Sequence, residues 1–566
     1  MGRTFEGMIA AALLGLPGLT AGVLAAAPDA PPPPLAADYE VTARPGAREL
    51  RVEATLAPRG AAVVLEEGLG PFVAEAEVDD GRGWRAAQPR GDTLPIPGCA
   101  ARPCRVRYTV KIADAALALR DRNRALYHTG SILAPPASWL ARPPRPRPGD
   151  RFRFRVRMPR GWSFVTGVSP SPSGRGFEGA LGDLPLAPYS GFGRFETASV
   201  RAGEGRVELA IAPGQRALDR AAIVDWAERA ARAVSGVYGR LPLPRVAVLV
   251  LPGGRRPVGF GTTLGHGGAS IMVWLGAQAT EEDLRRDWVL THEMAHLGLP
   301  NLPRAQRWLE EGLATYLEPV ARARAGQITP EEAWGGFVSG LPRGLPRAGD
   351  GGLDGTRSWG RTYWGGALYY LLADLEIRER TGNRRSLDDA LRGIVADGGT
   401  IAVRWSAARA LEAGDRATGV DVLQRLHARL GSSADHVDLD ALWARLGVRR
   451  REGGIVFDDG APLAAIRRSL MADSLPAVER RVLQVERLLQ ARLDGGEIAP
   501  SRRDVLLRAP IRVHGEGRGD LDHQLAGPCP RDLQAVRGQA HAALHHVAFA
   551  DQLEEHAEDP RGRPAP

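Results

Sequence analysis

Two histidines and a glutamate occur at a spacing that suits metal-dependent hydrolysis. Residues 291–296 read Thr-His-Glu-Met-Ala-His. On a helix, His292 and His296 lie one turn apart on the same face, and Glu293 lies beside them. Imidazole nitrogens are common zinc ligands, and a neighbouring carboxylate can serve as general base. The pattern therefore predicts a metallohydrolase site with His292 and His296 as zinc ligands and Glu293 as the catalytic base.

The segment around this motif is predicted to be one buried helix. Thr280 and Asp283 form a capping-box pattern at its start, and Gly298 followed by Pro300 ends it. Apolar residues occupy most of its circumference, which indicates burial on all sides. Because a polar group buried without a partner costs about 1–3 kcal/mol, the polar residues of the motif need partners. A metal ion supplies them; the alternative is that the histidines are hydrogen-bonded core residues.

A second stretch carries candidates for a third ligand. Residues 308–318 read Trp-Leu-Glu-Glu-Gly-Leu-Ala-Thr-Tyr-Leu-Glu. A catalytic zinc ion takes three protein ligands and keeps one position for water. Glu311, Thr315 and Glu318 share one helical face through their spacing, and Gly312 lets two helix backbones approach closely. A glutamate on this second helix can complete a zinc site, with one ion per chain.

The two stretches together resemble the gluzincin metallopeptidases, in particular the aminopeptidase-N family and the glycyl aminopeptidases. The shared pattern is HExxH followed by W-x-x-E-G-x-A-x-Y-x-E. The resemblance implies that Glu311 is the third zinc ligand and that Glu318 orients a ligand imidazole through its N–H. The connection from His296 to Glu311 is shorter than in the aminopeptidase-N pattern, which indicates a divergent branch.

The same resemblance implies roles for two further segments. In gluzincins the strand before the zinc helix pairs with the substrate, and Gly267, Gly268 and Ala269 occupy that place. This segment lacks the glutamate with which the aminopeptidase-N family holds the free amine of its substrate. Residues 359–368 resemble the segment S-Y-x-K-G-A, so Tyr363 matches the tyrosine that donates to the oxyanion, although Gly365 replaces the lysine. The alternative is that Tyr363 is a buried packing residue.

Composition and charge limit the class of protein. The chain has 566 residues, of which 44% are hydrophobic, enough for more than one core. The net charge of +8 would suit an anionic partner. Lys111 is the only lysine, however, and the arginines are interspersed with 66 acidic residues, which is typical of a GC-rich genome. We therefore expect no nucleic-acid partner.

The N-terminus is predicted to be a secretory signal peptide. Arg3 precedes an apolar run over 8–27, and Pro17 and Gly18 interrupt that run, which argues against a membrane-spanning helix. Removal of residues 1–27 leaves a chain with no stable membrane span, in the periplasm or outside the cell. Cys99 and Cys104 are close enough to form a disulfide, the favoured state of cysteines in an exported protein.

The predicted fold is a multidomain α+β architecture. Segments within 36–203, such as 104–110 and 151–156, alternate apolar and polar residues and predict an N-terminal β-sandwich. The resemblance implies a thermolysin-like zinc-peptidase domain over 204–320, completed by a helical region over 321–450. Residues 451–566 are predicted to form a C-terminal tail that is partly helical or poorly ordered.

The sequence thus predicts an exported zinc-dependent metallopeptidase that acts on a peptide or protein substrate. Two alternatives stay open. The first is a zinc hydrolase with a substrate other than a peptide. The second is an envelope binding or assembly protein with a vestigial zinc site.

Overall fold

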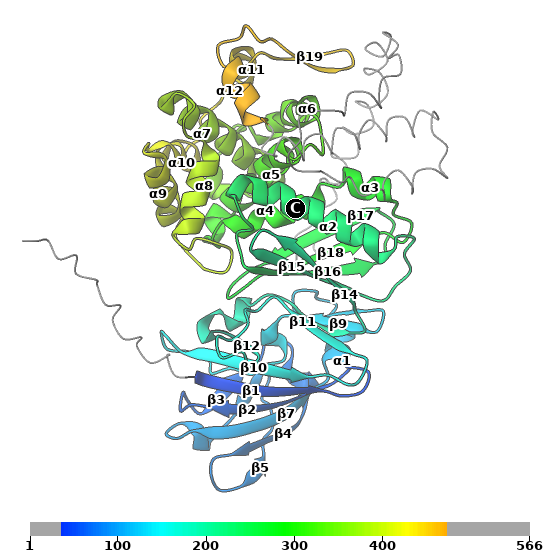
Figure 1. Ribbon diagram of the computed structural model, residues 1–566. Coiled ribbons are helices and arrows are strands. Elements are labelled where there is room, and N and C mark those ends of the chain that lie inside the picture. The colour runs from blue at the N-terminus through cyan, green and yellow to red at the C-terminus, as the bar shows by residue number, and fades with distance from the viewer. Residues whose placement is uncertain (1–34, 473–566) are drawn as a thin grey trace, which may run out of the picture. The chain divides into compact units, whose positions relative to one another are not determined.

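The computed structural model describes residues 35–472 (Figure 1). The predicted signal peptide, 1–27, most of the predicted tail, 451–566, and Cys529 lie outside the described residues. Strands predominate in the first part of the described chain and helices in the later part, which confirms the α+β fold class. From Leu35 to residue 472, no helix is long and apolar enough to cross a membrane.

Two sheets form the N-terminal β-sandwich. The larger has the strand order β12-β10-β1-β2-β7-β4-β5, and the smaller has the order β11-β13-β9-β8. Rings of Trp139, Phe154 and Phe192 meet edge to face in their shared core. The strands are β1 (Leu35–Ala43), β2 (Leu50–Leu56), β4 (Val73–Asp79), β5 (Trp84–Ala86), β7 (Cys104–Val110), β8 (Leu126–His128), β9 (Ser131–Ala134), β10 (Arg151–Arg157), β11 (Ser163–Thr166), β12 (Phe177–Ala180) and β13 (Ser190–Gly193). A short pair, β3 (Ala62–Val64) and β6 (Thr93–Pro95), and helix α1 (Ile112–Leu119) complete this part.

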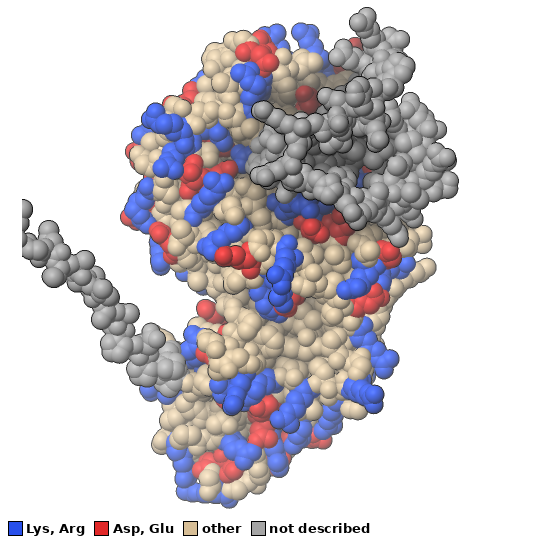
Figure 2. Space-filling view, in the orientation of Figure 1, with Lys and Arg blue, Asp and Glu red and all other residues tan. Residues whose placement is uncertain are grey.

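Strand β10 has one apolar face and one charged face, as its alternating sequence predicted. Phe152 and Phe154 point into the core, whereas the arginines that alternate with them pair with acids of the neighbouring strands, such as Arg153 with Asp38 at 2.5 Å. On the face drawn in Figure 2, basic and acidic residues lie interspersed. The predicted disulfide is also confirmed, because Cys99 is bonded to Cys104, the first residue of β7.

A five-stranded sheet carries the candidate site. Its order is β14-β15-β16-β18-β17, with β15, β16 and β18 parallel and the two outer strands antiparallel to their neighbours. All but the first residue of β16 are buried, as expected for an interior parallel strand. The hairpin of β14 and β15 spans the predicted domain boundary at residue 203, so this sheet includes residues on both sides of that boundary. The strands are β14 (Glu196–Ala202), β15 (Gly205–Ile211), β16 (Arg245–Pro252), β17 (Val258–Leu264) and β18 (Ser270–Leu275).

Helices pack on this sheet and on one another (Figure 1). Helices α2 and α4 contact the sheet, α5 packs on α4, and α7 packs on α5. The helices are α2 (Arg220–Tyr238), α3 (Glu281–Arg286), α4 (Val289–Ala295), α5 (Arg307–Arg324), α6 (Pro330–Gly340), α7 (Gly366–Thr381), α8 (Leu387–Ala396), α9 (Ala407–Thr418), α10 (Val422–Gly431), α11 (Leu439–Leu446) and α12 (Ala464–Leu470). Strands β19 (Val448–Arg451) and β20 (Gly454–Phe457) form a separate hairpin between α11 and α12.

The prediction of one helix over the zinc-ligand motif was wrong. Thr280 and Asp283 do form the capping box, but α3 ends at Arg286 because Asp287 leaves the helical conformation at ψ 137°. The Asp287 carboxylate accepts hydrogen bonds from the backbone N–H groups of Val289 and Leu290, and it thereby starts α4 as a new helix. His296 then opens a 3-10 turn, His296–Gly298.

The contact of α5 with α7 depends on two glycines. A Cβ atom on Gly312 would lie 2.3 Å from the Cα atom of Gly366, so no side chain fits between these backbones. Gly336 on α6 has nothing within 4 Å of such an atom.

We therefore predict opposite effects of two glycine-to-alanine substitutions in helices. Gly312→Ala lowers the free energy of unfolding by about 1–3 kcal/mol, because overpacking pushes α5 away from α7. Gly336→Ala is neutral or stabilising by up to about 1 kcal/mol, since alanine is the better helix former. Thermal and urea unfolding of both variants measure the difference, and equal effects would contradict the close packing.

Candidate metal centre

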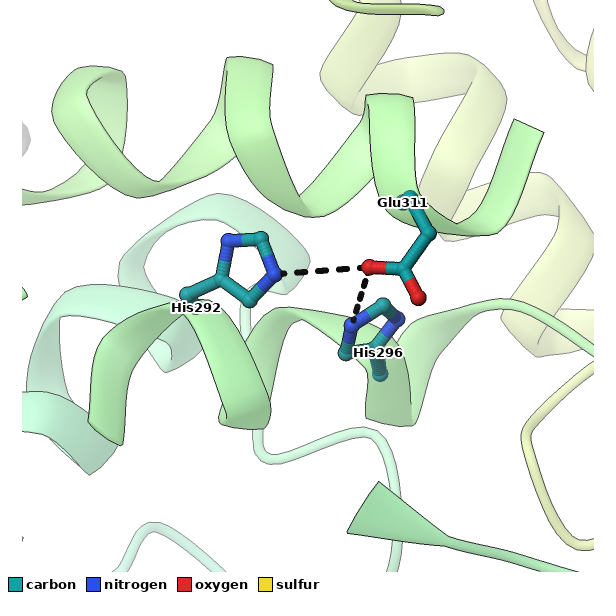
Figure 3. A group of neighbouring side chains, drawn as sticks. All are labelled: His292, His296 and Glu311. Atoms are coloured by element: carbon teal, nitrogen blue, oxygen red, sulfur yellow. Dashed lines mark ion pairs between the residues drawn. The ribbon is translucent and has the colours of Figure 1, made fainter. Parts of the chain in front are cut away.

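Three side chains from two helices converge on one point (Figure 3). His292 lies on α4, His296 directly follows that helix, and Glu311 lies on α5. The Glu311 Oε2 atom is 3.6 Å from the Nε2 atom of His292 and 3.6 Å from that of His296. The structure thus brings together the three residues that were predicted as ligands.

The donor set fits a zinc ion. The three ligand atoms lie within 4.8 Å of one another. Two ligands of a tetrahedral zinc ion, each at about 2.0–2.2 Å, are about 3.3–3.6 Å apart, which matches both distances to Glu311. Two imidazoles and one carboxylate are also a ligand set that catalytic zinc sites use.

Burial and charge determine the protonation of this group. Burial raises the pKa of Glu311, but the hydrogen bond with His292 and the charges of His296 and Arg307 outweigh it and hold the pKa well below its ordinary value. Burial lowers the pKa of His296 to about 4. Burial acts to lower the pKa of His292, but the hydrogen bond with Glu311 and the charge of Glu293 raise it. Metal binding requires an ionised carboxylate and neutral imidazoles, so a bound metal ion would replace the proton of His292.

The second oxygen of Glu311 has its own partner. Arg307, one turn earlier on α5, donates to Glu311 Oε1 from Nη2 at 3.0 Å and from Nε at 3.3 Å. The oxygen that faces the histidines is therefore not the oxygen that the guanidinium holds.

The side chain of Glu293 extends from α4 to strand β17. Burial raises the pKa of Glu293 to about 7. The hydroxyl of Thr263 donates to Glu293 Oε2 at 2.6 Å. A Cβ atom on Gly261 would lie 2.5 Å from Glu293 Cγ, so only glycine lets the strand run this close to the carboxylate.

The strand at the edge of the site is β17 and not the segment that was predicted. Strand β17 ends the order of the sheet, whereas β18 is paired on both sides. Gly267, Gly268 and Ala269 connect these two strands, and Gly268 pairs instead with Val168 of the N-terminal part. These three residues are not among those that line the cavity at the histidines. Their contact with substrate stays a prediction.

Tyr363 lies against His292 on an unusual turn. Residues Arg361–Gly365 form a π-helical turn directly before α7, and such turns occur frequently at functional sites. The buried Arg361 holds this turn by donating to the Gly344 carbonyl at 2.6 Å and pairing with Asp350 at 2.8 Å. The Tyr363 ring stacks on His292 with 6.2 Å between centroids. Burial and the charge of Glu311 raise the pKa of Tyr363 well above its ordinary value, so its hydroxyl remains a donor.

Glu318 is buried on the same face of α5 as Glu311, two turns further along the helix. Its carboxylate accepts a hydrogen bond from Arg322 at 2.7 Å, and its charge helps to raise the pKa of His292, against which burial acts. The role of Glu318 in orienting the imidazole stays a prediction.

The short connection between the two motif stretches is fixed by Glu310. Its carboxylate accepts a hydrogen bond from the Leu302 N–H at 2.8 Å. Asn301 forms a single bridge with Arg404, which ties the same loop to the helical region. A tight loop can therefore bring α5 back onto α4.

These groups line one cavity of about 220 Å³. It receives side chains from β17, from α4 with the turn after it, from α5, and from the helical region. Its lining residues are Phe260, Gly261, Thr262, Thr263, His292, Glu293, His296, Leu299, Asn301, Arg307, Glu310, Glu311, Tyr363 and Ile401.

Comparison with solved structures shows the fold. An aminopeptidase N family protein from Idiomarina loihiensis matches with a TM-score of 0.54 and 14% identity, over 74% of this chain and 81% of that protein. An M1 zinc metallopeptidase from Deinococcus radiodurans matches with a TM-score of 0.46 and 18% identity, over 71% of this chain and 94% of that one. The aminopeptidase-N-like architecture predicted from the motifs is confirmed at the level of the fold. No family model matches the sequence, and no curated protein does.

Sequence reasoning missed several residues of the site. Thr263 and Gly261 gave no signal, because a short apolar strand does not reveal which of its residues faces a helix elsewhere in the chain. Arg307 could have been found, since it precedes Glu311 by one helical turn. Arg361 and Glu310 act through backbone groups that only the folded chain brings near.

We predict that the purified protein holds about one zinc ion per chain and that Glu311→Ala holds far less. The substitution removes one of three ligands and leaves the charge of Arg307 beside the two histidines. Elemental analysis after dialysis against metal-free buffer measures this content. A variant that kept the full zinc content would show that Glu311 is not a ligand.

Proposed function

We propose that this chain is an exported zinc-dependent metallopeptidase. The observation that carries the proposal is the convergence of His292, His296 and Glu311 in one cavity with the carboxylate of Glu293. The fold shared with an aminopeptidase N family protein supports it. When bound, zinc supplies a Lewis acid that polarises a carbonyl group and makes water more acidic.

Glu293 acts as the general base in this proposal. Its carboxylate takes a proton from the attacking water and passes it to the nitrogen of the leaving amine. The hydrogen bond from Thr263 holds one carboxylate oxygen at a fixed position. The other carboxylate oxygen of Glu293, Oε1, then accepts the proton of the attacking water.

Tyr363 and the edge of β17 act on the substrate. The Tyr363 hydroxyl donates a hydrogen bond to the carbonyl oxygen as negative charge develops there. Strand β17 is the last strand of its sheet, so its outer backbone groups can pair with an extended peptide. Phe260, Gly261 and Thr262 line the cavity from this strand, which suits a peptide backbone held beside Glu293.

Export is supported by two features. The apolar run over 8–27 has the pattern of a signal peptide. Cys99 and Cys104 form a disulfide, and disulfides persist in oxidising compartments such as the periplasm. The proposed location is therefore the periplasm or the exterior of the cell.

Glu293→Gln tests the proposed chemistry. The amide keeps the shape of the side chain but cannot accept the proton, so we expect peptide cleavage to fall at least about a hundredfold while the zinc content stays that of the wild type. Mass spectrometry of a digested peptide library measures cleavage, and elemental analysis measures zinc.

Two results of this experiment would count against the proposal. Unchanged cleavage by a zinc-loaded Glu293→Gln variant would reject Glu293 as the base. A zinc-loaded wild type that cleaves no peptide of the library would reject the peptidase and favour a hydrolase with another substrate.

Tyr363→Phe tests the oxyanion donor. Removing one hydroxyl that binds mainly in the transition state should lower kcat by about 10- to 100-fold and leave KM nearly unchanged. Steady-state kinetics on a cleaved library peptide separate the two constants. A rise in KM alone would assign Tyr363 to substrate binding.

A further inference from the structure

We infer that Arg307 is a positioning residue of the metal centre, which holds Glu311 so that one carboxylate oxygen alone is offered to the metal. This inference rests on the proposed function. Arg307 directly precedes the second motif stretch, and its guanidinium donates to Glu311 from two nitrogens.

The geometry separates the two oxygens of Glu311. Arg307 contacts Oε1 with two nitrogens at 3.0 and 3.3 Å. His292 and His296 face Oε2 at 3.6 Å each. A planar guanidinium that donates from two nitrogens fixes the plane and rotation of a carboxylate better than a single contact does. The side chain of Glu311 therefore has one oxygen committed to the guanidinium and one turned to the histidines.

The place of Arg307 on its helix argues against a role in helix stability. It is the first residue of α5. The positive end of the helix dipole disfavours a cation there, and arginine before glutamate is the less favourable order for a pair one turn apart. Its side chain is 56% exposed, whereas that of Glu311 is only 11% exposed, so Arg307 reaches the buried carboxylate from the surface. We therefore assign Arg307 its role through the contact with the Glu311 carboxylate.

If Arg307 acts on the metal only through its charge, its removal should strengthen metal binding; if it positions Glu311, its removal should weaken metal binding. Removing a positive charge near a cation site should strengthen metal binding, because repulsion is lost. Removing a residue that orients a ligand should weaken it, typically by about 10- to 100-fold. Loss of repulsion would strengthen zinc binding, so a weaker site in Arg307→Met supports a positioning role for Arg307.

The test compares zinc affinity in Arg307→Met, Arg307→Lys and the wild type by competition with a chelator. We expect the zinc dissociation constant to rise about 10- to 100-fold in Arg307→Met. Arg307→Lys should lie between, since it keeps the charge and loses the fork. Arg304→Met is the matched control: Arg304 is an exposed arginine one turn earlier, outside the cavity lining, and its loss should leave affinity unchanged.

Two further readouts exclude a structural effect. Circular dichroism and thermal unfolding of metal-free Arg307→Met should show a folded protein at the temperature of the zinc titration, so that a loss of affinity is not a loss of folding. The visible spectrum of the cobalt-substituted variant should weaken, since a freed carboxylate binds through both oxygens and raises the coordination number.

Three outcomes would overturn the inference. Unchanged or tighter zinc binding with an unchanged cobalt spectrum would show that Arg307 does not position Glu311. A raised KM with wild-type zinc affinity would assign Arg307 to the substrate instead. A wild type that binds no zinc would reject the proposed function itself, and with it this inference.

Discussion

The site depends on one carboxylate held between two imidazoles inside the protein. Glu311 is only 9% exposed, and an ionised carboxylate in such a place needs compensating positive charge. His292, His296 and Arg307 surround it, and a zinc ion fits the side that the histidines face. The other parts of the structure serve this arrangement. Strand β17 closes one side, and the glycine contact between α5 and α7 lets the helix that carries Glu311 sit deep enough to meet α4.

Each departure from regular secondary structure near the site places one of its groups. Asp287 ends α3 and starts α4, which sets the direction of the helix that carries His292. The 3-10 turn at His296 shortens the path to the next helix. The π-helical turn before α7 turns Tyr363 toward His292. Breaks in helices at functional positions are a common result of competing local and long-range contacts.

The sequence predicted what local spacing controls. Ligands one turn apart, the capping box at Thr280, the disulfide and the alternating strands all follow from residues near one another in the chain. Gly267, Gly268 and Ala269 lie outside the lining of the cavity, because sequence does not reveal which of two adjacent strands ends a sheet, and their contact with substrate stays a prediction. The helix break at Asp287 was missed for a related reason: an aspartate fits both inside a helix and at its start, and only packing against Trp226, which donates to Asp287 at 2.8 Å, decides between them.

The central claim is that His292, His296 and Glu311 bind zinc together. Anomalous diffraction from crystals of the zinc-loaded protein, recorded on both sides of the zinc absorption edge, tests it most directly. The account predicts one strong peak at about 2.0–2.2 Å from Nε2 of each histidine and from Oε2 of Glu311. No peak at this position, or a peak that contacts only one of the three side chains, would contradict it.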